Sequence, residues 1–194
     1  MRCDYCYNRD IVFSKGTLRC AEALALLKER IGLLDAVVLS GGEATLYNEL
    51  IPFAKAIKAL GFKIKLDTNG TQPHVILALL EASLIDFVSL DYKAPPSKFE
   101  TTTHHKNFDA FNESLMLLIN SDLDFEVRTT VHTDMLDEND INMIIEDLHV
   151  KNYRGTYYIQ NFLYDENTIG KLKQPLKPLD RSKLKSLLHV KFRN

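Results

Sequence analysis

Two cysteines near the amino terminus have the spacing in this chain that most clearly indicates chemistry. Cys3 and Cys6 are separated by two residues in the stretch MRCDYCYN, and Tyr5 and Tyr7 lie beside them. Thiolates at this spacing bind soft metal ions or iron–sulfur clusters, or they form a redox-active dithiol. A metal or cluster usually needs more than two thiolates, so the other ligands must come from elsewhere.

The cysteine content of the chain indicates a reducing compartment. Three cysteines in 194 residues do not make a disulfide framework, so we expect a cytoplasmic protein. Cys20 falls at the start of an expected helix, where a small buried cysteine is the usual role. We therefore do not expect Cys20 to be a ligand.

Length and charge exclude several classes of protein. The chain is long enough for one domain with a sizeable core, which we expect to span residues 1–194. The net charge of −2 and the absence of a basic block give no reason to expect nucleic-acid binding. No apolar run is long enough to cross a bilayer and no signal peptide is visible, so no membrane association is expected.

Strands and helices are expected to alternate along the chain. Short, nearly continuous apolar runs predict five buried strands, at 36–40, 62–68, 86–92, 124–131 and 156–162. Helical apolar spacing predicts helices at 22–31, 50–60, 74–84, 108–121, 138–150 and 181–190. Residues 92–107 and 164–178 are expected to be irregular. The alternation predicts an α/β fold with right-handed crossovers and a parallel sheet.

Polar side chains follow each expected strand. Ligands collect at the carboxyl ends of parallel strands, whether the sheet closes into a barrel or stays open. The convergence of polar groups on one rim therefore predicts a binding site. The residues at the strand ends are Ser40–Glu43, Asp67–Gly70, Asp91–Lys93, the group Arg128, Thr130 and His132, and the pair Gln160 and Asn161.

Some of these residues have an alternative structural explanation. Gly41 and Gly42 allow the backbone to approach a ligand closely, but a tight turn with Glu43 as a capping acid explains them equally well. The stretch DTNG also reads as a turn. Arg128 lies on an apolar strand and needs a partner there, either a ligand carboxylate or a neighbouring acid such as Glu43.

Four stretches of the chain together resemble the radical S-adenosylmethionine (SAM) superfamily. They are RCDYCYN, LSGGEATL, LDTNG and SLDYK. The resemblance implies a partial (β/α)6 TIM-like barrel and a [4Fe–4S] cluster held by a C-x3-C-x2-C loop. It also implies that SAM binds the open iron and, on receiving one electron, yields a radical that abstracts hydrogen from a substrate.

Within this resemblance, Cys3 and Cys6 match the second and third cluster ligands. The first ligand falls two residues before Met1, and the first strand of the barrel is missing as well. We therefore expect an amino-terminally truncated chain that does not assemble a full cluster and is inactive by itself.

The resemblance assigns roles to the other site residues. The glycine pair and Glu43 are expected to receive the amino group of SAM, and Lys93 or Arg128 its carboxylate. An ordinary loop lysine is the alternative for Lys93, and a helix cap is the alternative for Glu43. The full set of expected cofactor-binding residues is Tyr5, Gly41, Gly42, Glu43, Asn69, Asp91, Lys93 and Arg128, with Cys3 and Cys6 as metal ligands.

The short chain with one cysteine motif resembles the activating enzymes of glycyl-radical enzymes. The implied activity is that of an oxidoreductase. The implied partner is a glycyl-radical enzyme such as anaerobic ribonucleotide reductase, with reduced flavodoxin or ferredoxin as electron donor.

Other functions remain open. They are a small-molecule radical SAM enzyme such as a deazapurine-forming synthase, a pyruvate formate-lyase activator, and a redox dithiol. A zinc-binding module with Cys3, Cys6, His104 and His105 as ligands, and a non-catalytic barrel that binds only a partner, are two further alternatives. His132 is expected to position substrate or to have a structural role only.

Overall fold

A curved parallel sheet forms the centre of the protein in the computed structural model, which describes residues 1–14 and 16–194. Its six strands are hydrogen-bonded in chain order, each parallel to the next. The expected α/β fold is thus confirmed, and each of the five expected strands is present. The strands are β1 (Ala36–Leu39), β2 (Lys63–Thr68), β3 (Phe87–Asp91), β4 (Phe125–Val131), β5 (Tyr157–Asn161) and β6 (Val190–Arg193).

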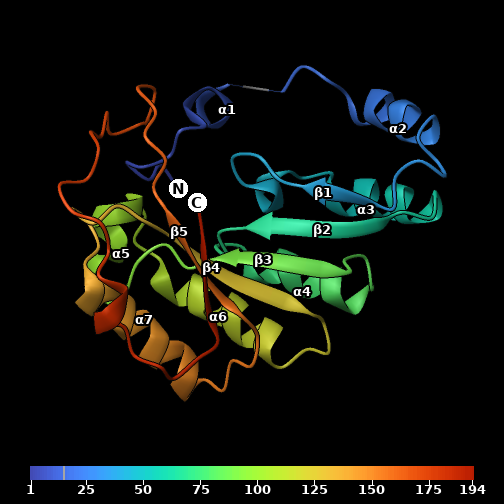
Figure 1. Cartoon of the computed structure of the whole chain (residues 1–194). Coiled ribbons are helices and arrows are strands. Elements are labelled where there is room, and N and C mark those ends of the chain that lie inside the picture. Colours follow the sequence, from blue (N-terminus) through green and yellow to red (C-terminus); the bar gives the residue numbers. More distant parts are fainter. Residues whose placement is uncertain (15) are drawn as a thin grey trace.

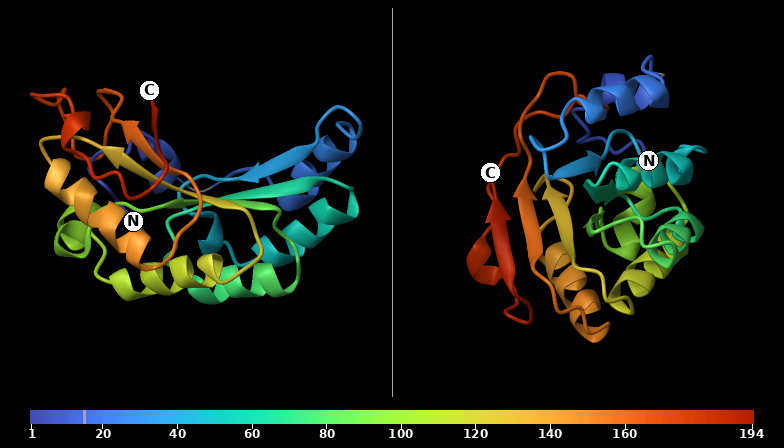
Figure 2. Two further views of the ribbon diagram at one scale, coloured as in Figure 1. Left: turned by 60° about the horizontal axis from the view of Figure 1, so that its bottom comes forward. Right: turned by 90° about the vertical axis from the view of Figure 1, so that its right-hand side faces the viewer.

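Helices cover the convex side of this sheet, and its concave side faces the amino-terminal segment (Figures 1 and 2). The helices on the convex side are α3 (Leu50–Ala59), α4 (Pro73–Glu81), α5 (Pro96–Thr103), α6 (Phe108–Ile119) and α7 (Glu138–Val150), whereas α1 (Arg9–Phe13) and α2 (Cys20–Lys28) belong to the amino-terminal segment. Two short 3-10 helices, η1 (Ala44–Leu46) and η2 (Arg181–Lys183), complete the set in the described residues. None of these helices has the length and apolar character needed to span a bilayer.

The prediction of a carboxy-terminal helix at 181–190 is wrong. Only η2 is helical there, and β6 follows as a sixth strand that pairs with β5 from Tyr157↔Val190 to Gln160↔Arg193. The apolar spacing of this segment fits a helix, but Leu184 and Leu188 instead pack against the core from an irregular segment. Tertiary packing therefore overrides local periodicity at this edge of the sheet.

Two short helices lie where no helix was expected. α5 interrupts the segment 92–107, beginning at Pro96 and ending at Thr103, and the capping residue His104 has a positive φ of 53°. Proline is favoured in the first turn of a helix because its missing N–H needs no partner there. α1 follows the cysteine pair directly and has no buried residue.

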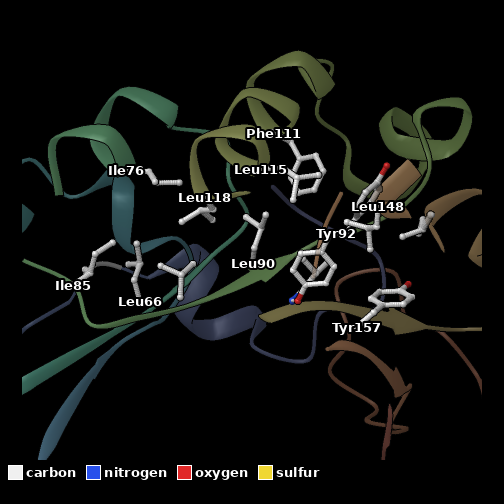
Figure 3. Close-up of a cluster of buried hydrophobic side chains, with 14 of the residues drawn as sticks. Leu66, Ile76, Ile85, Leu90, Tyr92, Phe111, Leu115, Leu118, Leu148 and Tyr157 are labelled. Carbon is white, nitrogen blue, oxygen red and sulfur yellow. The ribbon is translucent and has the colours of Figure 1, made fainter. Parts of the chain in front are cut away.

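The core lies between the sheet and the helices on its convex side (Figure 3). Leu66 and Leu90 of neighbouring strands are fully buried there, as are Phe111 and Leu115 of α6. Tyr92 packs edge-to-face on Phe111 with ring centroids 4.6 Å apart. Because successive strand residues point to opposite faces, the alternate residues Asp67, Asp91 and Arg128 lie on the concave face. That face carries the polar residues of the site.

Candidate functional site

A cavity of about 300 Å³ lies at the carboxyl ends of the strands. Its volume falls in the range typical of small-molecule sites. The cavity is lined by all of the residues expected to bind cofactor or metal: Cys3, Tyr5, Cys6, Gly41, Gly42, Glu43, Asn69, Asp91, Lys93 and Arg128. Their binding roles stay predictions.

Some of the other residues at the strand ends line the cavity, and one does not. Thr130, Gln160 and Asn161 also line the cavity, together with Asp67, which had not been given a role. His132 is 3% exposed and lies outside the cavity lining. Its Nε2 instead lies 2.9 Å from the carbonyl oxygen of Lys173, so its hydrogen bond is structural.

Five charged residues form what we call the strand-end network: Lys65, Asp67, Asp91, Lys93 and Arg128. Arg128 lies between two carboxylates, with its Nη2 3.2 Å from Asp67 Oδ2 and its Nε hydrogen-bonded to Asp91. Lys93 Nζ lies 2.9 Å from Asp91 Oδ2, and Lys65 Nζ 2.6 Å from Asp67 Oδ1. Arg128 thus has the acid partners that its apolar strand requires, but they are Asp67 and Asp91 rather than Glu43. The register explains this, because Asp91 and Arg128 are paired residues on β3 and β4.

The network sets the charges in the site. Burial alone would raise the pKa of Asp91, but attraction to Lys93 and Arg128 outweighs it and lowers that pKa below its usual value. For Lys93, burial would lower the pKa, but Asp91 and Cys3 more than offset this and raise it. Asp91 is therefore a carboxylate and Lys93 a cation at neutral pH. An incoming carboxylate would compete with Asp91 for Lys93.

Glu43 connects the turn after β1 to the end of β2. Its Oε1 accepts hydrogen bonds from Thr45 N (3.2 Å), Thr45 Oγ1 (2.6 Å) and Thr68 Oγ1 (2.7 Å). Its Oε2 accepts one from Asn69 N at 2.7 Å. The capping role considered for Glu43 is present, and the helix it caps is the short η1. Among the described contacts Oε2 retains capacity for a second donor, since a carboxylate oxygen has two lone pairs.

Asn69 shapes the turn after β2. Its Oδ1 accepts hydrogen bonds from Thr71 N at 3.0 Å and from Thr71 Oγ1 at 2.7 Å, as in an Asx turn. Gly70 has a φ of 71°, and a Cβ there would lie 2.9 Å from Leu90 Cδ1. The turn explanation of DTNG is therefore present in the structure, while Asn69 also borders the cavity.

The Gly41–Gly42 turn lies directly under α1. Gly41 has a φ of 134°, and a Cβ added at Gly41 or Gly42 would come within 3.9 Å of Ile11 or 3.8 Å of Val12. Helix α1 thus covers the glycine turn beside the cavity. Sequence reasoning missed this contact because five residues carry no periodic signal.

The two cysteines lie on one wall of the cavity, in a turn closed by a 3.0 Å hydrogen bond from Cys6 N to Cys3 O. We call residues 3–6 the cysteine loop. Burial raises the pKa of the Cys3 thiol, and nearby Lys93 partly opposes this. Tyr5 is buried beside Cys3, and its ring centroid lies 5.8 Å from Lys93 Nζ.

The donor atoms of the cysteine loop fit part of an iron–sulfur ligand set. Two soft sulfur donors border the cavity, but the described residues hold no group of three His, Cys, Asp or Glu placed to bind a metal. Cys20 lies elsewhere, with its Sγ 3.5 Å from Tyr47 Oη. These residues therefore do not complete a [4Fe–4S] site by themselves.

The same observation removes the zinc-module alternative for the described residues. His104 Nε2 lies 2.9 Å from Asp4 Oδ1 and is thus engaged with a carboxylate. His105 packs edge-on against Phe99. The four ligands of the zinc alternative are therefore not brought together in the described part of the chain.

Comparisons with known proteins agree with this fold and site. The family model described as "Radical SAM superfamily" matches residues 1–149. The chain therefore belongs to the radical SAM superfamily. A [4Fe–4S] cluster and SAM are the cofactors typical of this family.

Two curated relatives align with most of the chain. "Putative glycyl-radical enzyme activating enzyme" of Methanocaldococcus jannaschii is 33% identical over 187 residues, covering 90% of this chain and 75% of the relative. "7-carboxy-7-deazaguanine synthase" of Koribacter versatilis is 25% identical over 174 residues, covering 88% of this chain and 74% of the relative.

Solved structures share the fold. "Native anSMEcpe with bound AdoMet" has a TM-score of 0.71 at 20% identity, covering 91% of this chain and 52% of that one. "Crystal structure of methylornithine synthase (PylB)" has a TM-score of 0.72 at 15% identity, covering 94% and 56%. The chain thus spans about half the length of these two proteins.

Proposed function

We propose that this chain is the SAM-binding core of a radical SAM enzyme that activates a glycyl-radical enzyme. The observation that supports this most is that the cysteine pair, the glycine turn and residues of the strand-end network border the same cavity. The similarity to a relative with that activity in its name supports the same assignment.

In this proposal, different residues of the chain bind different groups of SAM. Gly41 and Gly42 let the backbone approach the ligand, and the free capacity of Glu43 Oε2 accepts its amino group. Lys93 attracts the carboxylate, while Arg128 holds Asp91 and Asp67 in place.

Cys3 and Cys6 would hold two corners of a [4Fe–4S] cluster beside this ligand. When bound, the cluster supplies one electron and SAM supplies the radical that abstracts the Cα hydrogen of a glycine. Tyr5 shields that side of the cavity from water, because it is buried against Cys3.

The partner in this proposal is a glycyl-radical enzyme, with anaerobic ribonucleotide reductase as the first choice. Reduced flavodoxin or ferredoxin would donate the electron, and the cytoplasm would be the compartment. The sheet is open, with β1 and β6 at its two edges, and an open sheet supports a macromolecular substrate better than a closed barrel does.

Calorimetric titration with SAM tests the binding part of the proposal. We expect the wild-type chain to bind SAM, and Lys93→Met to bind it about tenfold more weakly, as for loss of one charge-assisted hydrogen bond. Lys58→Met is the matched control, because Lys58 pairs with Asp86 but does not border the cavity. Equal affinity of both variants, or no binding by the wild type, would contradict the assignment.

Anaerobic reconstitution with iron and sulfide tests the cysteine loop. We expect the chain as printed to give no stoichiometric [4Fe–4S] cluster. A variant with a cysteine added two residues before Met1, which restores the C-x3-C-x2-C spacing, should show the cluster absorbance, whereas serine at that position should not. A full cluster in the unmodified chain would overturn the assignment of only two ligands.

Electron paramagnetic resonance tests the partner. The extended chain, with SAM, a reductant and anaerobic ribonucleotide reductase, should produce a glycyl-radical doublet on the reductase. If a chain that binds both cofactors gave no glycyl-radical signal, anaerobic ribonucleotide reductase would be excluded as the partner.

A deazapurine-forming activity is the second candidate, favoured by the similarity to 7-carboxy-7-deazaguanine synthase. Titration with 7-carboxy-7-deazaguanine separates the two candidates. The deazapurine-forming activity would be favoured if the chain bound 7-carboxy-7-deazaguanine only in the presence of SAM and produced no radical on the reductase.

A further inference from the structure

The cysteine loop is held in place by a distant part of the chain. We call residues 165–173 the clamp segment, which lies in the orange loop beside the N-terminus in Figure 1. The backbone N–H of Ile169 donates to Cys6 O at 3.0 Å, and the backbone N–H of Gly170 donates to Asp4 O at 2.9 Å. Two consecutive amides thus hold both halves of the cysteine loop.

Gly170 makes this close approach possible. A Cβ at Gly170 would lie 2.5 Å from Asp4 Cβ, 2.9 Å from Asp4 Cγ and 3.0 Å from Asp4 Cα. Gly170 does not have a positive φ, so the contact with the neighbouring loop, rather than a left-handed backbone, is what favours glycine here. The contact includes the backbone of Asp4, which a side-chain rotation does not relieve.

The clamp segment has internal order that presents these two amides. Thr168 is 1% exposed, and its Oγ1 accepts a 2.8 Å hydrogen bond from Leu172 N. Its carbonyl oxygen accepts another from Lys171 N at 3.0 Å. Leu172 then packs on the small apolar cluster of Cys3, Tyr5 and Phe162.

His132 connects the clamp segment to the end of β4. The carbonyl oxygen of Lys173 only accepts, so His132 Nε2, 2.9 Å away, carries the hydrogen. The His132 ring also packs on Phe162 at 4.8 Å between centroids. His132 therefore fixes the position of the clamp segment relative to the sheet. The clamp segment in turn fixes the position of the cysteine loop.

We propose that the clamp segment positions the cysteine pair against the cavity, and that Gly170 is a positioning residue whose lack of a Cβ keeps the loop in register. The proposal rests on the proposed function only for what the two thiols bind. Its tests measure thiol accessibility and backbone protection, so they can fail independently of SAM or cluster binding.

The first test compares alkylation of Cys3 and Cys20 by mass spectrometry. Cys20 starts α2, away from the clamp segment, and serves as an internal reference (Figure 1). In Gly170→Ala we expect the ratio of the Cys3 rate to the Cys20 rate to rise about tenfold, because local opening exposes the buried thiol. An unchanged ratio in a folded variant would overturn the proposal.

Gly155→Ala is the matched control. A Cβ at Gly155 would lie 2.5 Å from Tyr153 Oη and 2.9 Å from Phe125 O, so the steric conflict is similar but remote from the cysteine loop. We expect lower stability with an unchanged Cys3-to-Cys20 ratio. An equal rise of the ratio in Gly155→Ala would show that Gly170 acts through global stability alone, and would overturn the proposal.

A rescue variant and the wild-type protein complete the test. Asp4→Gly in the Gly170→Ala background removes the Cβ and Cγ conflicts, so the ratio should fall back toward the wild-type value. Hydrogen exchange of the wild-type chain should show protected amides at Ile169 and Gly170. Fast exchange at both would overturn the proposal even if Gly170→Ala did not fold.

Discussion

The strand-end network and the cysteine loop border the same cavity but are built differently. The network consists of side chains on β2–β4 and the residues that follow, and its ions contact one another across neighbouring strands. The cysteine loop belongs to no strand and is held through its backbone by the clamp segment. The network depends on charge pairing within the sheet, whereas the loop depends on shape and on contacts far away in sequence.

This difference separates the effects of substitutions. A change in the network should affect folding stability, since a buried charge without a partner is costly. A change around the cysteine loop should affect thiol accessibility with little change in global stability, because few side-chain interactions hold the loop.

The largest effect is expected for Arg128→Met. The substitution leaves Asp67 and Asp91 without their shared cation, and the Arg128 side chain is only 16% exposed. We expect the free energy of unfolding in urea to fall by about 3–5 kcal/mol. Arg193→Met is the control, because Arg193 pairs with Glu126 but is 36% exposed, so its loss should be about 1 kcal/mol or less. If the two variants lost equal free energy of unfolding, the strand-end network would be no more important for stability than an exposed ion pair.

Glu43→Gln should have the second largest effect. The carboxylate accepts hydrogen bonds from Thr45, Thr68 and Asn69, and its replacement removes the charge that strengthens them. We expect a loss of about 1.5–3 kcal/mol in urea unfolding. Glu49→Gln, whose carboxylate accepts from the exposed Tyr47 hydroxyl, should change stability little. If Glu43→Gln were as mild, the turn would not depend on this carboxylate.

Acidification should weaken the network through Asp91. The pKa of this carboxyl is lowered in the folded state, so its stabilisation is present above the unfolded value of about 4. That stabilisation is lost as pH falls through the folded pKa, by about 1.4 kcal/mol for each unit of depression. Urea unfolding between pH 7 and pH 3 should therefore show a flatter pH dependence in Asp91→Asn than in the wild type. Identical slopes would show that Asp91 does not contribute.

The smallest effect on stability is expected for His104→Ala. The His104–Asp4 pair supports the cysteine loop but is 52% and 30% exposed, so its loss should change the free energy of unfolding by less than about 1 kcal/mol. The Cys3-to-Cys20 alkylation ratio should nevertheless rise about twofold. Lys106→Ala, which removes an exposed pair with Glu100, should leave the ratio unchanged. A large stability loss in His104→Ala would erase the distinction between the two regions.

Sequence reasoning succeeded where periodicity carries the information. The apolar runs at β1 to β5 predict strands, and parallel strands bring the residues after them to one rim. That argument brings Glu43, Asp91 and Arg128 to one cavity. It does not identify the acid partners of Arg128, because these depend on the register of β3 and β4.

Sequence reasoning failed where packing decides the local structure. The segment 181–190 has helical spacing, yet after the short helix η2 it bonds to Asn142 of α7 and leads into β6, which pairs with β5. The five residues of α1 are too few to show a period, and their position is set by contact with Gly41 and Gly42.

The sequence by itself determined the parallel α/β architecture, the rim of polar residues and the pair of thiols, because apolar periodicity and residue chemistry are local properties. Only the tertiary structure decided how the cysteine loop meets that rim. Gly170 and Asp4 are far apart in the chain, and their contact leaves no local pattern to read. The contact exists because His132 anchors the clamp segment and because Asp4 of the cysteine loop occupies the space that a side chain at Gly170 would need.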